Sequence, residues 1–382
     1  MNRNSKSNNH PLWGVNRSSA KWGQHRGLFV KSSPDTRFRT SSAGDERAVS
    51  EVLGVIMMMA MVITIMGGVW VFLNPYLVDF QDNTNWKSAV SIADRIDDRL
   101  DVAGSSPENT GIRNTYSLKS TILMPVENVE KWSISADLVN SERIEIISLN
   151  TTSISILAAN ETARSVKIEN EDSSFTQSFQ ASHEAVVITH NISKQHWLMI
   201  TVYDEDNTPI HRSFEISLSG LTITTSFGEG QHQIALMNNA RTSQFPNEPW
   251  HVTRLPNMEI DTLANGQFRF SILLTDVTWN GSLGSSNNMA INFESLGALT
   301  LFTGDAYNVR FTVNNNLHDV ITPQYHDSWL TDYKINRASG TLDTYTGYAP
   351  YQRASGADGI TIESQGAIIN LEIDLQRIEV GR

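Results

Sequence analysis

Two groups of polar residues in this chain have types and a spacing that suit metal binding. Asp204, Glu205 and Asp206 form an acidic run, and carboxylate oxygens are the ligands that calcium prefers. The run lacks the glycine and the distal glutamate of an EF-hand loop, so a solvated acidic turn is the favoured interpretation. For the second group, two His-Asp pairs, polar loop residues are favoured over a metal site. These pairs are His318-Asp319 and His326-Asp327.

Motifs for catalysis are missing from the sequence. No GxSxG elbow, HExxH helix, Walker loop or pair of carboxylates stands in a convincing context of strands and helices. Trp250, Trp279 and Trp329 are of a type that stacks on sugars, but tryptophan in a β-rich chain is more often a core residue. We therefore expect no catalytic residues, no cofactor and no metal, and a protein that is not an enzyme.

One further carboxylate has an informative position. Glu51 directly precedes the segment from Val52 to Leu73, which runs for 22 residues without a charge. As a helix this segment is about 33 Å long, enough to cross the hydrocarbon core of a bilayer. A charge at the centre of a bilayer costs about 2.5–3.5 kcal/mol. Glu51 is therefore expected either at the headgroup edge or paired with a positive group.

The distribution of charge predicts the orientation of this span. Residues 1–48 hold nine Lys and Arg against three Asp and Glu, a net charge of +6, whereas the whole chain carries −12. The basic side of a membrane protein stays in the cytoplasm, so the acidic remainder is expected outside the cell. We expect a single-pass protein of the cell membrane, with a cytoplasmic N-terminus and an extracellular C-terminal domain. Its acidity argues against nucleic acid as a partner.

The junction before the apolar run resembles a known family. The residues from Arg47 to Ile56 read RAVSEVLGVI and lead into a Met-rich apolar run. Over residues 45–75 the chain resembles archaeal type IV pilin-like proteins, which carry a class III signal peptide. The resemblance implies that a prepilin-type leader peptidase cuts between Ala48 and Val49, with Arg47 as the charged residue before the cut. The leader, residues 1–48, is long for this class and reads as a disordered cytoplasmic tract.

Processing at this position would give Glu51 a partner. The cut implied by the resemblance frees a positive α-amine on Val49, two residues from the carboxylate of Glu51. In a bundle of such helices, the carboxylate of one subunit can neutralise the amine of its neighbour. We therefore expect Glu51 to pair subunits within the membrane, and other pilin-like subunits to be partners. The alternative is that Glu51 merely occupies the headgroup zone.

Helical periodicity continues beyond the membrane span. After a transmembrane helix over residues 49–74, Asn74-Pro75 is expected to break or kink the helix. An amphipathic stalk helix is predicted over residues 75–104, with Gly104 as its C-cap. The apolar positions that define its face are Trp86, Ala89, Val90, Ala93, Ile96 and Leu100.

From about residue 115 the hydrophobic period changes to two. Phe268-Phe270-Ile272-Leu274 is one of several runs that alternate apolar and polar residues. We predict a mainly β fold, an antiparallel β-sandwich-like ectodomain in two β units, residues 115–226 and 258–382. The Pro- and Asn-rich stretch 227–257 is the expected seam. Because a fragment starting near residue 105 keeps every alternating strand, it is expected to be soluble.

The exported part has no cysteine and holds four glycosylation sequons. Its core must be stable without disulfides, which about 270 residues of β structure can provide. Asn-x-Ser/Thr sequons mark surface loops that accept glycans. The acceptor residues are Asn150, Asn160, Asn191 and Asn280.

These patterns together predict a membrane-anchored archaeal surface protein. The resemblance implies a pilin-like, structural or adhesive subunit, and the bulky ectodomain suits a minor or specialised pilin. A glycan or another surface ligand is the expected partner of the ectodomain. The alternative is a monomeric surface protein that uses a pilin-type leader and carries a carbohydrate-binding or enzymatic ectodomain.

Overall fold

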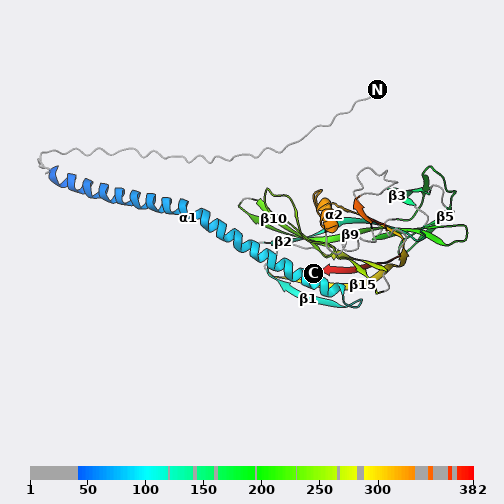
Figure 1. Ribbon diagram of the computed structural model, residues 1–382. Helices are drawn as coiled ribbons and strands as arrows, with labels where there is room; N and C mark the ends of the chain where they lie inside the picture. The colour runs from blue at the N-terminus through cyan, green and yellow to red at the C-terminus, as the bar shows by residue number, and fades with distance from the viewer. Residues whose placement is uncertain are drawn as a thin grey trace, which may run out of the picture. The chain divides into compact units, whose positions relative to one another are not determined.

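One helix of 63 residues, α1, precedes a β-rich region in the computed structural model of the chain (Figure 1). α1 spans Ser42–Gly104 and continues through Pro75, so Asn74-Pro75 does not break the helix, and the alternative of a kink there stays a prediction. The structure describes residues 42–118, 121–140, 144–158, 162–193, 196–228, 230–264, 267–281, 288–331, 343–346, 360–363 and 368–382, and side-chain burial from residue 50.

The first and second halves of α1 differ in how far their side chains are buried. Every side chain from residue 50 to residue 81 is exposed, although most of them are apolar. From Ala89 onward the helix buries one face, at the spacing that the stalk pattern predicts. The helix ends at Gly104 as expected, and the backbone packs closely at this glycine: a Cβ there would lie 2.7 Å from Oε1 of Gln376. The buried positions are Ala89, Ile92, Ala93, Ile96, Leu100 and Ala103.

Residues of two different sheets surround this buried helix face. Leu123 and Leu236 belong to one sheet, and Phe293 and Ile378 belong to the other, and all four share one hydrophobic cluster with the helix. Ion pairs add to this packing: Asp94 lies 2.5 Å from Arg241, and Asp97 lies 2.5 Å from Arg254. The second half of α1 is therefore part of the core of the β region.

The first sheet has five strands. Its neighbours pair antiparallel except β14 and β19, which run parallel over 13 residue pairs. A parallel pair requires a crossover connection, and here the chain supplies β15 to β18 between the two strands. In spatial order the strands are β1 (Gly111–Tyr116), β15 (Met289–Ala306), β19 (Ile369–Gly381), β14 (Phe268–Asn280) and β13 (Met258–Thr262).

The second sheet has eleven strands and a branch at its long central strand. The main path runs through β12 (His251–Arg254), β11 (Ala240–Gln244), β10 (Gly230–Met237), β9 (Pro209–Phe227), β2 (Thr121–Asp137), β16 (Asn308–Asn315), β18 (Ile360–Glu363) and β17 (Asp343–Thr346). The branch adds β8 (Trp197–Tyr203) beside β9, then β5 (Ser165–Glu169) and β6 (Ser174–Ser178).

A small third sheet and a short helix complete the described elements. The third sheet contains β3 (Glu145–Asn150), β4 (Ser153–Leu157) and β7 (Val186–Thr189), in that order. The helix α2 spans Ile321–Thr331.

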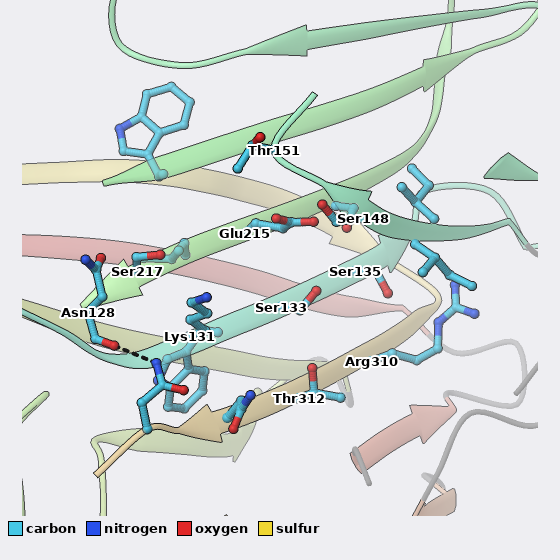
Figure 2. A pocket seen from close by; sticks show the side chains of 18 of the residues that line it. Asn128, Lys131, Ser133, Ser135, Ser148, Thr151, Glu215, Ser217, Arg310 and Thr312 are labelled. Carbon is cyan, nitrogen blue, oxygen red and sulfur yellow. Dashed lines mark hydrogen bonds between the residues drawn. The ribbon is translucent and has the colours of Figure 1, made fainter. Parts of the chain in front are cut away.

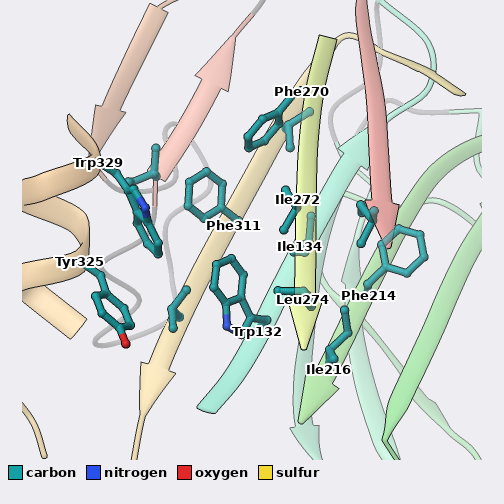
Figure 3. Packing of buried hydrophobic residues seen from close by; sticks show 14 of the residues in the cluster. Trp132, Ile134, Phe214, Ile216, Phe270, Ile272, Leu274, Phe311, Tyr325 and Trp329 are labelled. Carbon is teal, nitrogen blue, oxygen red and sulfur yellow. The ribbon is translucent and has the colours of Figure 1, made fainter. Parts of the chain in front are cut away.

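The main hydrophobic core lies between the two large sheets (Figure 3). Phe270 and Leu274 of β14 share this cluster with Trp132 of β2, and α2 contributes Trp329. The ring of Phe270, on β14, lies 5.9 Å from the ring of Phe311, on β16 of the other sheet, measured between centroids. Residues of opposite sheets meet in this way because alternate side chains of each strand point inward. The predicted mainly β fold with a sandwich-like core behind an N-terminal apolar helix is confirmed.

One fully buried carboxylate ties four elements together beside this core. Glu130 follows a bulge in β2 and is 0% exposed. Its carboxylate accepts hydrogen bonds from Trp132 Nε1 at 3.0 Å, Tyr325 Oη at 2.9 Å, and the side-chain amides of Asn238 and Asn315. Burial raises the pKa of Glu130, and these four donors oppose that rise.

A second core forms where the third sheet covers part of the large sheet. The outward residues of β5 and β8 are apolar, and Val166, Leu198 and Ile200 pack there against Ile154 and Ile156 of β4. The third sheet covers only the apolar part of this face. The neighbouring strands present polar residues instead, and their face forms the groove described below.

The β region does not divide at residues 227–257. Strands of the two expected β units pair with each other: β2 pairs β16 over eight residues, and β1 pairs β15 over six. The expected seam itself forms β10, β11 and β12 of the eleven-stranded sheet. Residues from Val71 onward form one compact unit. The alternation of apolar and polar residues along a strand does not reveal which distant strand it pairs with. For this reason the sequence pattern predicted two β units where the structure has one.

The packing of α1 predicts where the head can be cut from its anchor. A fragment of residues 81–382 keeps the whole buried helix face and should fold. A fragment of residues 105–382 loses all six buried side chains of that face, each apolar side chain contributing about 1–3 kcal/mol. This second fragment, which the strand pattern alone expects to be soluble, should aggregate or unfold. Cooperative thermal unfolding followed by circular dichroism compares the two, and equal melting temperatures would contradict the prediction.

Candidate functional site

The exposed half of α1 is the first functional feature. In the described part of the chain, α1 is the one helix long and apolar enough to cross a membrane, with no residue of its apolar window buried. Exposed apolar side chains at this density are unfavourable in water. Val52, Ile56, Met59 and Ile63, for example, are each more than half exposed. This stretch is consistent with a single membrane span.

The residues of the expected processing site lie at the start of α1. Arg47, Ala48 and Val49 are helical, in the first turns after Ser42. Glu51 is exposed, on the same helix, at the edge of the apolar run. Cleavage after Ala48 remains a prediction, and it requires the first turns to open. Helix ends fray readily, because their first four N–H groups have no partner within the helix.

Three of the four sequon asparagines are on the surface. Asn150, Asn191 and Asn280 are exposed, whereas Asn160 lies outside the described residues. The Oδ1 atom of Asn150 accepts the backbone N–H of Thr152 at 2.8 Å and so shapes the turn between β3 and β4. The Nδ2 atom of Asn280 donates to Glu379 at 3.1 Å. Glycosylation at all four positions remains a prediction.

The acidic run folds into a hairpin turn between β8 and β9. Asp204 Oδ1 accepts the backbone N–H groups of Asp206 and Thr208, at 2.9 and 2.8 Å. Glu205 forms an ion pair with Arg164 at 2.6 Å. These contacts describe the acidic turn that the sequence favours over a calcium loop. In the described ranges no group of three or more His, Cys, Asp or Glu side chains is arranged to hold a metal ion, the His-Asp pairs near α2 included.

An open polar groove of about 640 Å³ lies on the outer face of the eleven-stranded sheet (Figure 2). Its floor is the outward face of β16, β2 and β9, and β3 forms one wall. The strand register arranges nine polar residues of this floor in a grid, about 4.8 Å apart between strands and about 7 Å apart along them. The three rows are Arg310, Ser135 and Ser213; Thr312, Ser133 and Glu215; and Asn314, Lys131 and Ser217.

Burial increases along this grid toward the third sheet. Lys131 and Asn314 are exposed, whereas Ser213 and Arg310 are 3% and 4% exposed. Beyond them, Asp137 Oδ1 lies 2.8 Å from Nδ1 of His211 and 3.4 Å from Nη2 of Arg310. Arg310 also donates to the backbone oxygen of Ile144 at 2.7 Å, and so links the floor to the third sheet.

The charges of this buried cluster follow from its contacts. Burial lowers the pKa of His211, which is therefore neutral at pH 7, and the hydrogen bond that its Nδ1–H donates to Asp137 offsets only part of that shift. Burial alone would raise the pKa of Asp137, but the His211 hydrogen bond and the charge of Arg310 outweigh it and hold this pKa below its ordinary value. The cluster thus pairs one carboxylate with one guanidinium beside a neutral imidazole.

A second hollow of about 480 Å³ adjoins the groove around the β2 bulge. It shares Glu127, Asn128 and Ser217 with the groove. His196 lines it, and its Nδ1 lies 2.9 Å from the buried carboxylate of Asp276. The hydrogen bond with Asp276 raises the pKa of His196. The two hollows therefore adjoin each other at these shared residues.

The tryptophans singled out in the sequence have different environments. Trp250 and Trp329 are 3% and 2% exposed and belong to the core. Trp279 is half-buried and lines the second hollow. The groove itself was missed by sequence reasoning, although its signal is present: Ser133-x-Ser135 and Ser213-x-Glu215-x-Ser217 place polar residues at every outward position.

Comparisons with protein-family models, with curated proteins and with solved structures find no match to this chain. The architecture is pilin-like in its order, a long apolar N-terminal helix followed by β structure. From residue 49 onward the chain combines a helix able to anchor in a membrane with a β-rich head, and these two features define its class.

The Asp137–His211 cluster predicts a loss of stability in acid. A His or Asp with a lowered pKa in the folded state stabilises above its unfolded pKa and loses that contribution as the pH falls. We expect His211 to remove about 1.4 kcal/mol of unfolding free energy per pH unit below about 6.5. The variant His211→Asn keeps an N–H donor near Asp137 but does not titrate, so its stability should fall less between pH 7 and pH 5.

Denaturant unfolding of the detergent-solubilised chain at several pH values measures this difference. His196, whose pKa is raised, contributes with the opposite sign in both proteins and cancels in the comparison. His251→Asn, at an exposed position of β12, is the control and should follow the wild type. Parallel pH profiles for wild type and His211→Asn would contradict the assignment.

Proposed function

We propose that the chain is a pilin-like subunit of an archaeal cell surface, structural or adhesive and not catalytic. The observation that carries this proposal is the division of α1 into an exposed apolar half and a half that is part of the β head. A helix of this kind can anchor in a bilayer, or pack with copies of itself, without any linker between anchor and head.

The orientation in this proposal follows from charge. The basic residues 1–48 stay in the cytoplasm, and the acidic head is extracellular. A prepilin-type leader peptidase removes the basic segment after Ala48, and Val49 becomes the new N-terminus. The removal leaves a helix whose only acidic group near its start is Glu51.

Assembly through the N-terminal helices is the next step of the proposal. Side chains of residues 52–73 are exposed and uncharged, so they suit contact with lipid and with neighbouring helices equally. The Glu51 carboxylate of one subunit neutralises the Val49 amine of the next. An unpaired charge would be costly in such a bundle, so the pairing selects the correct stagger.

A monomeric surface protein that uses the same leader is the second candidate. The size of the head favours it, because the compact unit from Val71 to Arg382 is bulky for repetitive packing. Both candidates predict cleavage, and only the first predicts that Glu51 affects assembly.

Processing is tested by substitution of the residue before the cut. Ala48→Leu places a bulky side chain where a small one fits the peptidase, so a longer form that keeps residues 1–48 should accumulate in the membrane. Mass spectrometry of the N-terminus measures the cut. Ala60→Leu, the same change at an exposed position within the apolar run, should leave processing intact. A wild-type protein that retains residues 1–44 in a strain with active peptidase would refute the proposed cut.

Assembly is tested at Glu51. Glu51→Gln keeps size and membrane insertion but removes the charge that neutralises the Val49 amine, so filament yield should fall at least several-fold. The measurement is the amount of sheared filament relative to total membrane-bound protein. Asp79→Asn removes a carboxylate from an exposed position farther along α1 and should have no effect. Equal yields from Glu51→Gln and wild type would exclude the pairing role, and no filaments from wild type would support the monomer.

A further inference from the structure

We propose that the polar groove over β16, β2 and β9 binds a neutral oligosaccharide chain. This proposal concerns the head alone and does not depend on leader processing or on assembly. It therefore holds for a filament subunit and for a monomeric surface protein alike.

The shape of the site suits an extended polymer. The groove of about 640 Å³ continues into the second hollow of about 480 Å³ through the residues they share around the β2 bulge. The floor is the outward face of neighbouring strands, and its labelled polar side chains lie side by side along them (Figure 2). A chain molecule can lie along this face and contact several of these side chains in turn.

The floor offers hydrogen-bonding groups in a regular array. The backbone groups beneath it are paired within the sheet, so the side chains are available to a ligand. Six described residues of the floor line the groove with hydroxyl, amine or amide groups that a ligand in the groove can reach. They are Lys131, Ser133, Ser135, Ser213, Thr312 and Asn314.

Ser213 is the most informative of these residues. It is 3% exposed and it lines the groove, so a ligand lying in the groove can reach it. A ligand hydroxyl at this position would exchange a hydrogen bond with the Ser213 hydroxyl. The deep end of the groove is therefore built for a polar ligand group.

The mixture of charges selects a neutral ligand. Lys131 and Arg310 face the acidic residues Glu127, Glu145 and Glu215 around the groove. An anionic polymer such as nucleic acid needs an excess of positive charge, which this surface lacks. A peptide strand would need apolar pockets for alternate side chains, whereas the outward positions of the floor strands are polar. A sugar chain matches the array, because each ring carries several hydroxyls that donate and accept.

The second hollow adds an aromatic surface to the polar floor. Trp279 lines it together with Asn128 and His196. An indole presents a large apolar face on which a sugar ring can pack, while the polar groups around it bind the hydroxyls. The groove and the hollow together thus offer both kinds of contact to one chain.

Direct binding tests the proposal with the full chain in a zwitterionic detergent, because maltoside or glucoside detergents would themselves compete. Isothermal titration calorimetry uses neutral hexasaccharides of glucose, mannose, galactose and N-acetylglucosamine. We expect at least one of them to bind with a Kd below about 1 mM. An acidic hexasaccharide of hyaluronan should bind at least tenfold more weakly. The absence of binding by all four neutral sugars would overturn the proposal, as would preferential binding of a Ser/Thr-rich peptide.

Substitutions locate the binding in the groove. Ser133→Trp fills the middle of the floor and should weaken binding at least tenfold. Thr312→Val removes one hydroxyl at constant shape and should weaken it several-fold. Ser178→Trp makes the same large change on β6, an exposed edge of the same sheet outside the groove, and should leave the affinity unchanged. An unchanged affinity in Ser133→Trp, with its melting temperature equal to that of wild type, would also overturn the proposal.

Discussion

The burial of one face of α1 among residues of both large sheets is the interaction on which the rest of the structure depends. The sheets share their main core through inward residues such as Trp132 and Phe270, and the helix completes a second cluster with both of them. Ion pairs from Asp94 and Asp97 to arginines of the β region add directional contacts to this packing. The second half of α1 is therefore held in the β region by both apolar packing and ion pairs.

The outer face of the eleven-stranded sheet is covered by other parts of the chain in one region and open to solvent in another. A sheet this wide exposes more surface than one partner layer can cover, so the side chains differ along it. Where the third sheet covers it, Leu198 and Ile200 are apolar and buried. Where it is open, Ser133 and Glu215 are polar and form the groove. The Asp137–His211–Arg310 cluster lies near the boundary between these regions, where the carboxylate of Asp137 is shielded from water and paired with the guanidinium of Arg310.

Buried polar residues also determine how distant segments meet. Glu130 accepts hydrogen bonds from α2, from β16 and from the turn between β10 and β11. Asn238 of that turn has a positive φ of 50°, a conformation that asparagine tolerates better than most residues. Removal of any donor would leave a buried polar group without its partner, so this network favours one arrangement of the elements over others.

The sequence by itself determined the local features of this protein. The uncharged run from Val52 to Leu73 requires a long apolar helix, and alternation in segments such as Phe268–Leu274 requires strands that are half buried, because both periods follow from backbone geometry. Tertiary structure alone decided which strands pair. The pairing of β2 with β16 joins residues more than 170 positions apart, and the strand pattern is the same whichever neighbour a strand selects. The groove therefore exists only in the folded chain, because its floor combines three strands whose polar residues are adjacent in register and remote in sequence.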